Sequence, residues 1–186
     1  MDNNVRLQDI IDSKILNERK IFLWGQIDDD SARHVIERLL YLEMVAPKSE
    51  IQLIINSPGG YVTSGFAIYD TMKSISSPIS TVCSGLAASM ASIILSAGAK
   101  GRRFILPNAR VMIHQPSGGA TGVASDIEIQ MDEIIKTKLL GAEILAANCG
   151  QTVEKVMKDF NRDHWMSAKE SITYGIVDGE VKKLIK

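Results

Sequence analysis

The sequence has few residues of the kinds that mark several functional classes. Its 186 residues include 2 cysteines, 3 histidines and 5% aromatic residues. Two cysteines, Cys83 and Cys149, are too few for the disulfide framework of a small secreted domain, so we expect two reduced, buried thiols. The charges nearly cancel, with 21 Lys and Arg against 22 Asp and Glu. No basic excess is therefore present for binding nucleic acid.

Signals for export and for the membrane are also missing. Residues 1–6 are polar and lack the apolar segment of a signal peptide. The one long uncharged stretch, residues 74–99, is interrupted by serines, glycines and Pro78, which fits a buried strand followed by a buried helix better than a membrane span. We therefore expect a soluble, cytoplasmic protein that does not enter a membrane.

Motifs that bind phosphate or metal are absent from the sequence. It contains no Gly-x-x-x-x-Gly-Lys-Ser/Thr loop and no Cys-x-x-Cys or His-x-x-x-His spacing, and its three histidines are widely separated. We expect no metal site.

The composition that remains is that of a folded α/β domain. Apolar residues make up 45% of the chain and charged residues 23%, which excludes a disordered chain. Short apolar runs predict strands at residues 21–24, 51–55, 79–83 and 110–114. Segments with helical spacing of apolar residues lie between them, at residues 31–45, 63–75 and 88–97. Alternating strands and helices predict a sheet with crossover connections.

The first predicted helix has a clear start and a clear inner face. Asp30 or Ser31 is expected to cap it. The side chains expected to be buried are Val35, Leu39, Leu42 and Val45.

A long helix follows a glycine-rich loop in the second half of the chain. The loop covers residues 117–124, and Ser125-Asp126-Ile127-Glu128 has the form of a capping box. The helix should run over residues 126–148 and end at Gly150. At ~1.5 Å per residue its length is roughly 35 Å, about the width of a small domain. We expect it to project past its own core, so its apolar stripe needs cover from another copy of the chain. Two shorter helices are predicted at residues 153–160 and 167–174.

Two segments carry features of acyl-transfer chemistry. Asn56-Ser57-Pro58-Gly59-Gly60 directly follows a predicted strand, and its glycines free the backbone to turn N–H groups toward a developing oxyanion. The alternative is a simple strand-to-helix turn.

Ser89 lies among small residues at a predicted helix start, where a nucleophile gains from the positive end of the helix. The alternative there is a capping serine. The surrounding sequence is not the Gly-x-Ser-x-Gly turn of the α/β-hydrolases.

Three histidines compete for the role of general base. His34 is expected on the solvated side of a helix, and His164, beside Trp165, fits a structural position. His114 ends an apolar strand and precedes a glycine-rich loop, so rigid backbone holds it beside a mobile rim. Such a base needs a carboxylate that fixes its tautomer. The candidate is Asp163, whose neighbours are bulky enough to exclude water, and the alternative for it is an ordinary surface acid.

These segments together resemble the proteolytic subunit of the Clp protease family (ClpP), a self-compartmentalising serine peptidase. The matching segments are Ile55-Asn56-Ser57-Pro58-Gly59-Gly60, Ala87-Ala88-Ser89-Met90, Met112-Ile113-His114-Gln115-Pro116, Asp126-Ile127-Glu128-Ile129-Gln130, and Arg162-Asp163 with Met166-Ser167-Ala168. The intervals of 25 positions from the serine to the histidine and 49 from the histidine to the aspartate also suit the family.

The resemblance implies a fold and an assembly. The fold is α/β of the ClpP/crotonase kind, built from repeated β-β-α and βα units. A short N-terminal segment covers residues 1–15, and one peptidase domain covers residues 16–186. The region of about residues 115–150 would be the family's projecting handle, which joins two stacked heptameric rings into a closed chamber. An AAA+ Clp ATPase would unfold proteins and feed the unfolded polypeptides into that chamber.

The resemblance also implies a role for individual residues. Ser89 would be the nucleophile, His114 the general base and Asp163 the orienting acid. The backbone N–H groups of Gly60 and Met90 would form the oxyanion hole. An extended peptide would add as a strand along a substrate rim, for which the expected residues are Tyr61, Val62, Pro116, Ser117, Gly118 and Gly119. The subunit itself would need no metal, nucleotide or other cofactor.

The sequence departs from the family at its docking face. Gln52, Ile54 and Ser74 stand where many members carry aromatic residues that line the ATPase-docking pocket. Because an aromatic side chain buries ~150–250 Å², smaller or polar groups should weaken this anchor. The N-terminal segment, residues 1–15, is also shorter than usual, and Ser117 replaces a common apolar residue. We hypothesise that the chain is a paralogous subunit that pairs with a second ClpP ring carrying the ATPase.

Three other functions compete with this one. An acyl-CoA enzyme of the crotonase type shares the general fold and a backbone oxyanion hole, but it uses acid/base carboxylates and a nucleotide-binding surface. Peptidases that process signal peptides use a serine with a lysine base, which His114 and Asp163 make unnecessary. A catalytically silent, structural ring subunit is the third alternative, and the presence of all three triad residues argues against it.

Overall fold

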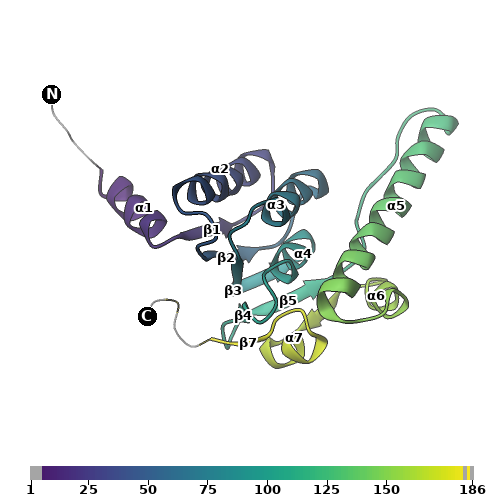
Figure 1. The fold of residues 1–186 in the computed structure, drawn as a ribbon. Helices are drawn as coiled ribbons and strands as arrows, with labels where there is room; N and C mark the ends of the chain where they lie inside the picture. The colour runs from purple at the N-terminus through teal and green to yellow at the C-terminus, as the bar shows by residue number, and fades with distance from the viewer. Residues whose placement is uncertain (1–5, 182–183, 185–186) are drawn as a thin grey trace.

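The chain folds into a mixed α/β structure in which helices pack on a largely parallel sheet (Figure 1). The computed structural model describes residues 6–181 and residue 184. Within them the strands form one seven-stranded sheet in the order β1-β2-β3-β4-β7, with β5 paired to β3 and β6 paired to β5. Every pair is parallel except β5 with β6. The predicted α/β class is confirmed.

The elements alternate along the chain much as the apolar pattern predicts. The strands are β1 (Lys20–Trp24), β2 (Ile51–Ser57), β3 (Ile79–Ala88), β4 (Arg103–Ile105), β5 (Arg110–Ile113), β6 (His164–Met166) and β7 (Gly179–Glu180). The helices are α1 (Leu7–Asn17), α2 (Asp29–Val45), α3 (Val62–Ser74), α4 (Met90–Ser96), α5 (Ala124–Cys149), α6 (Val153–Asp159) and α7 (Ala168–Tyr174).

Four elements were not predicted from the sequence. The strands β4, β6 and β7 have only three, three and two residues, too few for a periodic apolar pattern. The helix α1 buries none of its side chains, so it carries no core-facing stripe. It also crosses the predicted boundary between residues 15 and 16.

The strand β3 holds the sheet together, because it pairs with three other strands. Its first half pairs with β2 and, through residues 81–83, with β4. Its last residues, 86–88, pair with β5 in place of β4, while Ala87 still pairs with Ser57 of β2. The sheet therefore divides into two branches beyond the middle of β3, and the branch of β5 and β6 carries the candidate site described below.

The packing of α2 differs from the prediction at both ends. Its N-cap is Asp28, not Asp30 or Ser31. The Asp28 carboxylate accepts from the backbone N–H of Ser31, whose hydroxyl in turn accepts from the Asp28 N–H. At the other end Val45, the last residue of the helix, is 61% exposed. The other three predicted positions, Val35, Leu39 and Leu42, are buried as expected.

The long helix α5 projects away from the sheet, as predicted (Figure 1). Only its last third packs on the core, where Ala142, Leu145 and Ala146 are buried. It ends with Gly150 in the left-handed conformation. The predicted capping box at Ser125 is wrong, because the helix begins two residues earlier, at Ala124, and its N-cap residue Val123 makes no side-chain cap.

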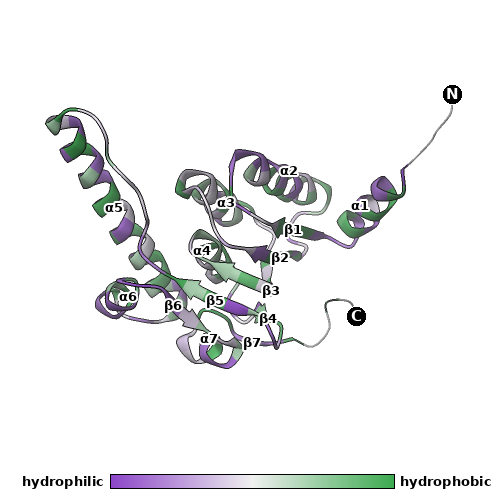
Figure 2. Ribbon diagram, turned by 180° about the vertical axis from the view of Figure 1, so that it is seen from behind, coloured by the Kyte–Doolittle hydropathy of each residue, from purple (hydrophilic) through white to green (hydrophobic). Residues whose placement is uncertain are grey.

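Hydrophobic residues occur along the projecting part of α5 (Figure 2), and several of their side chains are exposed. Four of them recur every four residues and so share one side of the helix, namely Ile127, Met131, Ile135 and Leu139. We call these four residues the α5 stripe. Exposed apolar surface of this kind marks an interaction surface.

The segment of residues 74–99 folds as the predicted buried strand and helix, β3 and α4. Among the described residues, no helix combines the length and the apolarity that crossing a bilayer requires.

Both cysteines are buried and unpaired, which confirms the prediction of free thiols. Burial raises the pKa of Cys83 and of Cys149 from 9.0 to about 12. Well below pH 9 both thiols are almost fully protonated in the folded and the unfolded chain, so they do not change stability with pH. Between pH 9 and 12 only the unfolded chain loses these protons, so stability should fall as the pH rises.

The thiols should therefore resist alkylation in the native protein. At pH 8 we expect iodoacetamide to modify both cysteines at least about 10³-fold more slowly than in urea, because the thiolate is the nucleophile. Mass spectrometry of timed samples measures this ratio. Native and unfolded rates of similar size would contradict the burial of Cys83 and Cys149.

Candidate active site

Three side chains from distant parts of the sequence form one line of hydrogen bonds. The Nε2 atom of His114 lies 2.8 Å from the Oγ atom of Ser89. Its Nδ1 atom lies 3.0 Å from the Oδ1 atom of Asp163. When Nδ1 carries the proton, the imidazole donates to the carboxylate and accepts from the serine hydroxyl. The structure thus brings together the three residues to which the sequence assigned catalysis.

The register of three strands explains this arrangement. Ala88, the last residue of β3, pairs with Met112 of β5. Ile113, the last residue of β5, pairs antiparallel with His164, the first residue of β6. Ser89 directly follows β3, His114 directly follows β5, and Asp163 directly precedes β6. The pairing of these strand ends therefore places the three residues side by side.

Ser89 has a strained backbone. Its φ is +54° and its ψ is −125°, a region that residues other than glycine rarely adopt. The turn is held by the Ser89 N–H, which donates to the carbonyl of Met112 at 2.9 Å, and by the hydroxyl of Ser92, which donates to the carbonyl of Ser89. Such strain persists where the surrounding structure enforces it, and it is concentrated at functional sites.

The Ser89 hydroxyl does not cap α4. Ser89 occupies the N-cap position, but its side chain makes no capping hydrogen bond and contacts His114 instead. The alternative of a capping serine is therefore wrong.

The glycine turn after β2 lies directly against the serine turn. Gly59 has a φ of +92°, and a Cβ atom added to it would lie 2.7 Å from the Cβ of Ser89 and 3.0 Å from the backbone N of Met90. No larger residue fits there without moving one of the two turns. The N–H groups of Gly60 and Met90 donate to no acceptor within the part of the chain that the structure describes. Of these two donors, Met90 directly follows the serine, and Gly60 directly follows the glycine that packs against it.

Asp163 is more open to water than the sequence analysis expected. Its side chain is 60% exposed, whereas that of His114 is 24% exposed. The expected shield, Trp165, lies two residues along the edge strand β6 and is itself largely exposed, with its ring stacked against Arg110. In the single chain, therefore, water reaches the carboxylate.

Two hydrogen bonds anchor the backbone on either side of His114 and Asp163. The N–H of Gln115 donates to the carbonyl of Phe160 at 2.8 Å, and its side-chain amide donates to the carbonyl of Asn161 at 3.1 Å. They hold the segment after β5 against the segment before β6, which limits movement of the imidazole relative to the carboxylate.

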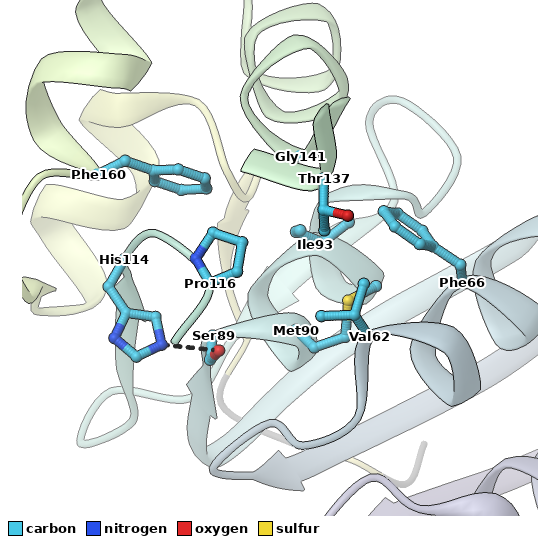
Figure 3. Close-up of a pocket in the computed structure, with 10 residues that line it drawn as sticks. All are labelled: Val62, Phe66, Ser89, Met90, Ile93, His114, Pro116, Thr137, Gly141 and Phe160. Atoms are coloured by element: carbon cyan, nitrogen blue, oxygen red, sulfur yellow. Dashed lines mark hydrogen bonds between the residues drawn. The ribbon is translucent and has the colours of Figure 1, made fainter. Parts of the chain in front are cut away.

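An apolar cavity opens beside Ser89 (Figure 3). It encloses about 340 Å³, its open mouth included. Two residues predicted for the substrate rim, Val62 and Pro116, line it. The lining residues that the sequence analysis missed are Phe66, Ile93, Thr137, Gly141 and Phe160. They come from α3, α4, α5 and the end of α6 and meet only in the folded chain. For this reason no local sequence pattern identifies them.

The other predicted rim residues lie outside the cavity. Tyr61 is largely exposed and precedes α3. Ser117, Gly118 and Gly119 form an exposed segment that leads toward α5. A Cβ atom on Gly118 would lie 3.3 Å from Ile134, so this segment runs close along the helix.

The two remaining histidines lie away from this line. His34 is exposed on α2, as predicted. His164 lies against the ring of Tyr174, with the ring centres 5.8 Å apart. Within residues 6–181 and 184, no three His, Cys, Asp or Glu side chains are grouped so that they could hold a metal ion.

The fold and the site define an α/β protein with a Ser–His–Asp line beside an apolar cavity. The sequence matches the Clp protease family over residues 2–183, which is nearly its full length. The chain belongs to this family, and the resemblance found in the sequence is confirmed. At the level of the family it is a peptidase of the ClpP type.

The exposure of Asp163 leads to a prediction about its substitution. Loss of a buried triad carboxylate costs about 10⁴-fold in kcat. Water screens an exposed ion pair, and an exposed amide is free to turn its oxygen toward Nδ1. We therefore expect Asp163→Asn to lower kcat for a short peptide by only about 10²-fold.

A steady-state assay at saturating peptide measures this loss. Glu154→Gln, the same change at an exposed carboxyl on α6, is the control and should keep full activity. A loss of 10⁴-fold would mean that the active particle buries Asp163, and no loss would remove Asp163 from catalysis.

Proposed function

We propose that the chain is a serine endopeptidase that hydrolyses peptide bonds of unfolded proteins. The observation that carries the proposal is the continuous line of Ser89, His114 and Asp163, with contacts of 2.8 and 3.0 Å. A serine hydroxyl is a weak nucleophile unless an adjacent base removes its proton, and here a base lies within hydrogen-bond distance.

In the first half of the reaction, Ser89 Oγ attacks the carbonyl carbon of the peptide bond while His114 Nε2 takes the hydroxyl proton. The imidazolium that forms is stabilised by Asp163, which accepts from Nδ1. The tetrahedral intermediate then breaks its C–N bond. His114 gives its proton to the leaving amine, and an ester remains on the serine.

In the second half, water attacks the ester carbonyl and His114 takes a proton from it. The second tetrahedral intermediate collapses, the C–O bond to Ser89 breaks, and His114 returns the proton to the serine oxygen. The products are a free carboxylic acid and the restored serine, so protons and bonds balance over the cycle.

Backbone donors stabilise both intermediates. We assign this role to the N–H groups of Gly60 and Met90, since both are free among the described residues, Met90 follows the serine, and Gly60 follows Gly59, which packs against it. Met90 is the first residue of α4, so its N–H points from the positive end of a helix. Removal of one donor of this kind lowers kcat by about 10²–10³-fold.

The substrate would bind as an extended strand along the rim that includes Tyr61, Val62, Pro116 and the segment from Ser117 to Gly119. Exposed backbone in such a segment is able to form main-chain hydrogen bonds with a peptide of any sequence. A single side chain of the substrate would then enter the apolar cavity beside Ser89.

For the assembly, we propose two stacked heptameric rings joined through α5. Support comes from the α5 stripe, which is apolar, exposed and outside the core of its own chain. A closed chamber would need an AAA+ ATPase to supply unfolded substrate. Of the three expected docking positions, Ile54 is only 2% exposed and Ser74 is exposed but small, which supports weak docking on this subunit. A second ClpP paralogue would then carry the ATPase.

Peptide hydrolysis measured beside native mass tests the proposal. The purified chain, alone and mixed with candidate partner subunits, should hydrolyse a fluorogenic peptide in at least one ring assembly. A chain that enters rings but never hydrolyses peptides would instead be a silent structural subunit. If the chain alone docks an AAA+ ATPase and degrades folded proteins, the paralogue hypothesis is wrong.

A further inference from the structure

The peptide unit between Ser89 and Met90 contains the carbonyl of the serine and one of the two N–H groups assigned to the oxyanion hole. This peptide bond is trans, and in a planar trans unit the C=O and the N–H point in opposite directions. Any group that holds the Ser89 carbonyl in place therefore also fixes the direction in which the Met90 N–H points.

Ser92 holds this carbonyl through two hydrogen bonds. Its backbone N–H donates to the Ser89 oxygen at 3.0 Å, and its hydroxyl donates to the same oxygen at 2.6 Å. Both lone pairs of the carbonyl are thus occupied. Ser92 is only 1% exposed, so water does not compete for these bonds. The second bond comes from a side chain, and a substitution is able to remove it while the backbone bond remains.

The other N–H group of the oxyanion hole is held in a similar way. The carbonyl of Gly59 accepts from the N–H of Ile27 at 2.8 Å, and the Gly60 N–H belongs to the same trans peptide unit. Each of the two N–H groups therefore lies opposite a hydrogen-bonded carbonyl. Among the described residues, a side chain contributes to this support only at Ser92.

A hydrogen bond to a carbonyl affects the N–H of the same peptide unit in two ways. It restrains rotation of the peptide plane, and it polarises the unit so that the N–H becomes a stronger donor. Both effects act most strongly on the transition state, in which negative charge develops on the substrate oxygen. Binding of the uncharged substrate depends on them much less.

We propose, on the basis of the peptidase function above, that Ser92 is a positioning residue for the oxyanion hole. Its hydroxyl fixes and polarises the peptide unit of Ser89 and Met90, and it thereby strengthens the hydrogen bond from the Met90 N–H to the oxyanion. Because Ser92 is buried, its hydroxyl acts through that unit and not on the substrate itself.

Ser92→Ala tests the proposal, because it removes the side-chain bond and leaves the backbone bond. We expect kcat for a short peptide to fall about tenfold with KM unchanged, as for an interaction that acts only in the transition state. The loss is smaller than the about 10²–10³-fold caused by removing a whole donor, since Met90 keeps its N–H. Ser92→Cys, with a similar size and a weak S–H donor, should lie between the wild type and Ser92→Ala.

Ser96→Ala is the matched control. Ser96 is also 1% exposed and lies one turn further along α4, where its hydroxyl donates to the carbonyl of Ile93 at 2.7 Å. It also accepts from the side-chain amide of Asn148 on α5 at 3.0 Å, so this variant loses more hydrogen bonds than Ser92→Ala. We expect Ser96→Ala to lower Tm at least as much as Ser92→Ala and yet to keep the wild-type kcat.

Steady-state kinetics, Tm and native mass measured on the same preparations distinguish the outcomes. An unchanged kcat in Ser92→Ala and Ser92→Cys, an equal loss of kcat in Ser96→Ala, or a loss that appears as a raised KM overturns the positioning role. Each of these results leaves the peptidase function standing. If the wild-type chain cleaves no peptide in any assembly, the peptidase function itself is overturned, and the role of Ser92 with it.

Discussion

Replacing Ser89 with alanine is expected to lower kcat for short peptides by about 10⁴- to 10⁶-fold. Loss of the nucleophile in a serine peptidase has an effect on this order, because the remaining groups have no oxygen to activate. Folding should hardly change, since among the described residues the side chain of Ser89 hydrogen-bonds only to His114 and does not cap α4. Peptide hydrolysis and native mass should be measured on the same preparation.

The matched control is Ser49→Ala, an exposed serine in the turn after α2. It should keep both activity and native mass. Wild-type activity in Ser89→Ala would remove Ser89 from its role as nucleophile. Loss of assembly in the same variant would mean that the serine turn also supports subunit contacts.

Replacing Ile135 with lysine is expected to separate the two rings. Ile135 is 59% exposed at the centre of the α5 stripe, where a charge would have to be buried against the partner helix. An unpaired charge in such a contact costs several kcal/mol, and every pair of subunits would carry it. Native mass or gel filtration should then show single rings or smaller species.

Glu133→Gln is the control, because it changes the charge by the same amount on the opposite side of the same helix. Within residues 6–181 and 184, Glu133 pairs only with Lys136, and both side chains are exposed. This variant should keep the wild-type particle size. An unchanged size in Ile135→Lys would contradict the role of the α5 stripe as the contact between rings.

Two neighbouring residues of α5, Ile134 and Ile135, have different surroundings in the structure. Ile134 and Ile135 both belong to the apolar pattern of the predicted helix. In the folded chain Ile134 turns toward the segment at Gly118, whereas Ile135 points to solvent. The choice of residue for the experiment above depends on this difference.

The residues of the site were predictable from the sequence because their chemistry and their place at strand or helix ends are local properties. Ser89 follows a run of small residues, and His114 ends an apolar strand. Their approach to Asp163 was not visible from composition or periodicity. It depends on the pairing of β5 with β6, a strand of three residues, and the family resemblance alone pointed to it.

The surroundings of the site could not be predicted. The exposure of Asp163 follows from the position of β6 at an edge of the sheet, where Trp165 faces solvent instead of covering the carboxylate. The cavity depends on Phe66, Gly141 and Phe160, which are far apart in the sequence. Contacts between residues so far apart in the sequence cannot be predicted from a short window of residues.

Covalent labelling with a serine-directed phosphonate tests the central claim most directly. In the assembled protein, peptide mapping should find a single adduct, on Ser89, and His114→Ala should abolish it because the imidazole activates the hydroxyl. A crotonase-type enzyme would remain unmodified. Absence of an adduct on Ser89 in every assembly, or an adduct of equal yield without His114, would contradict the account.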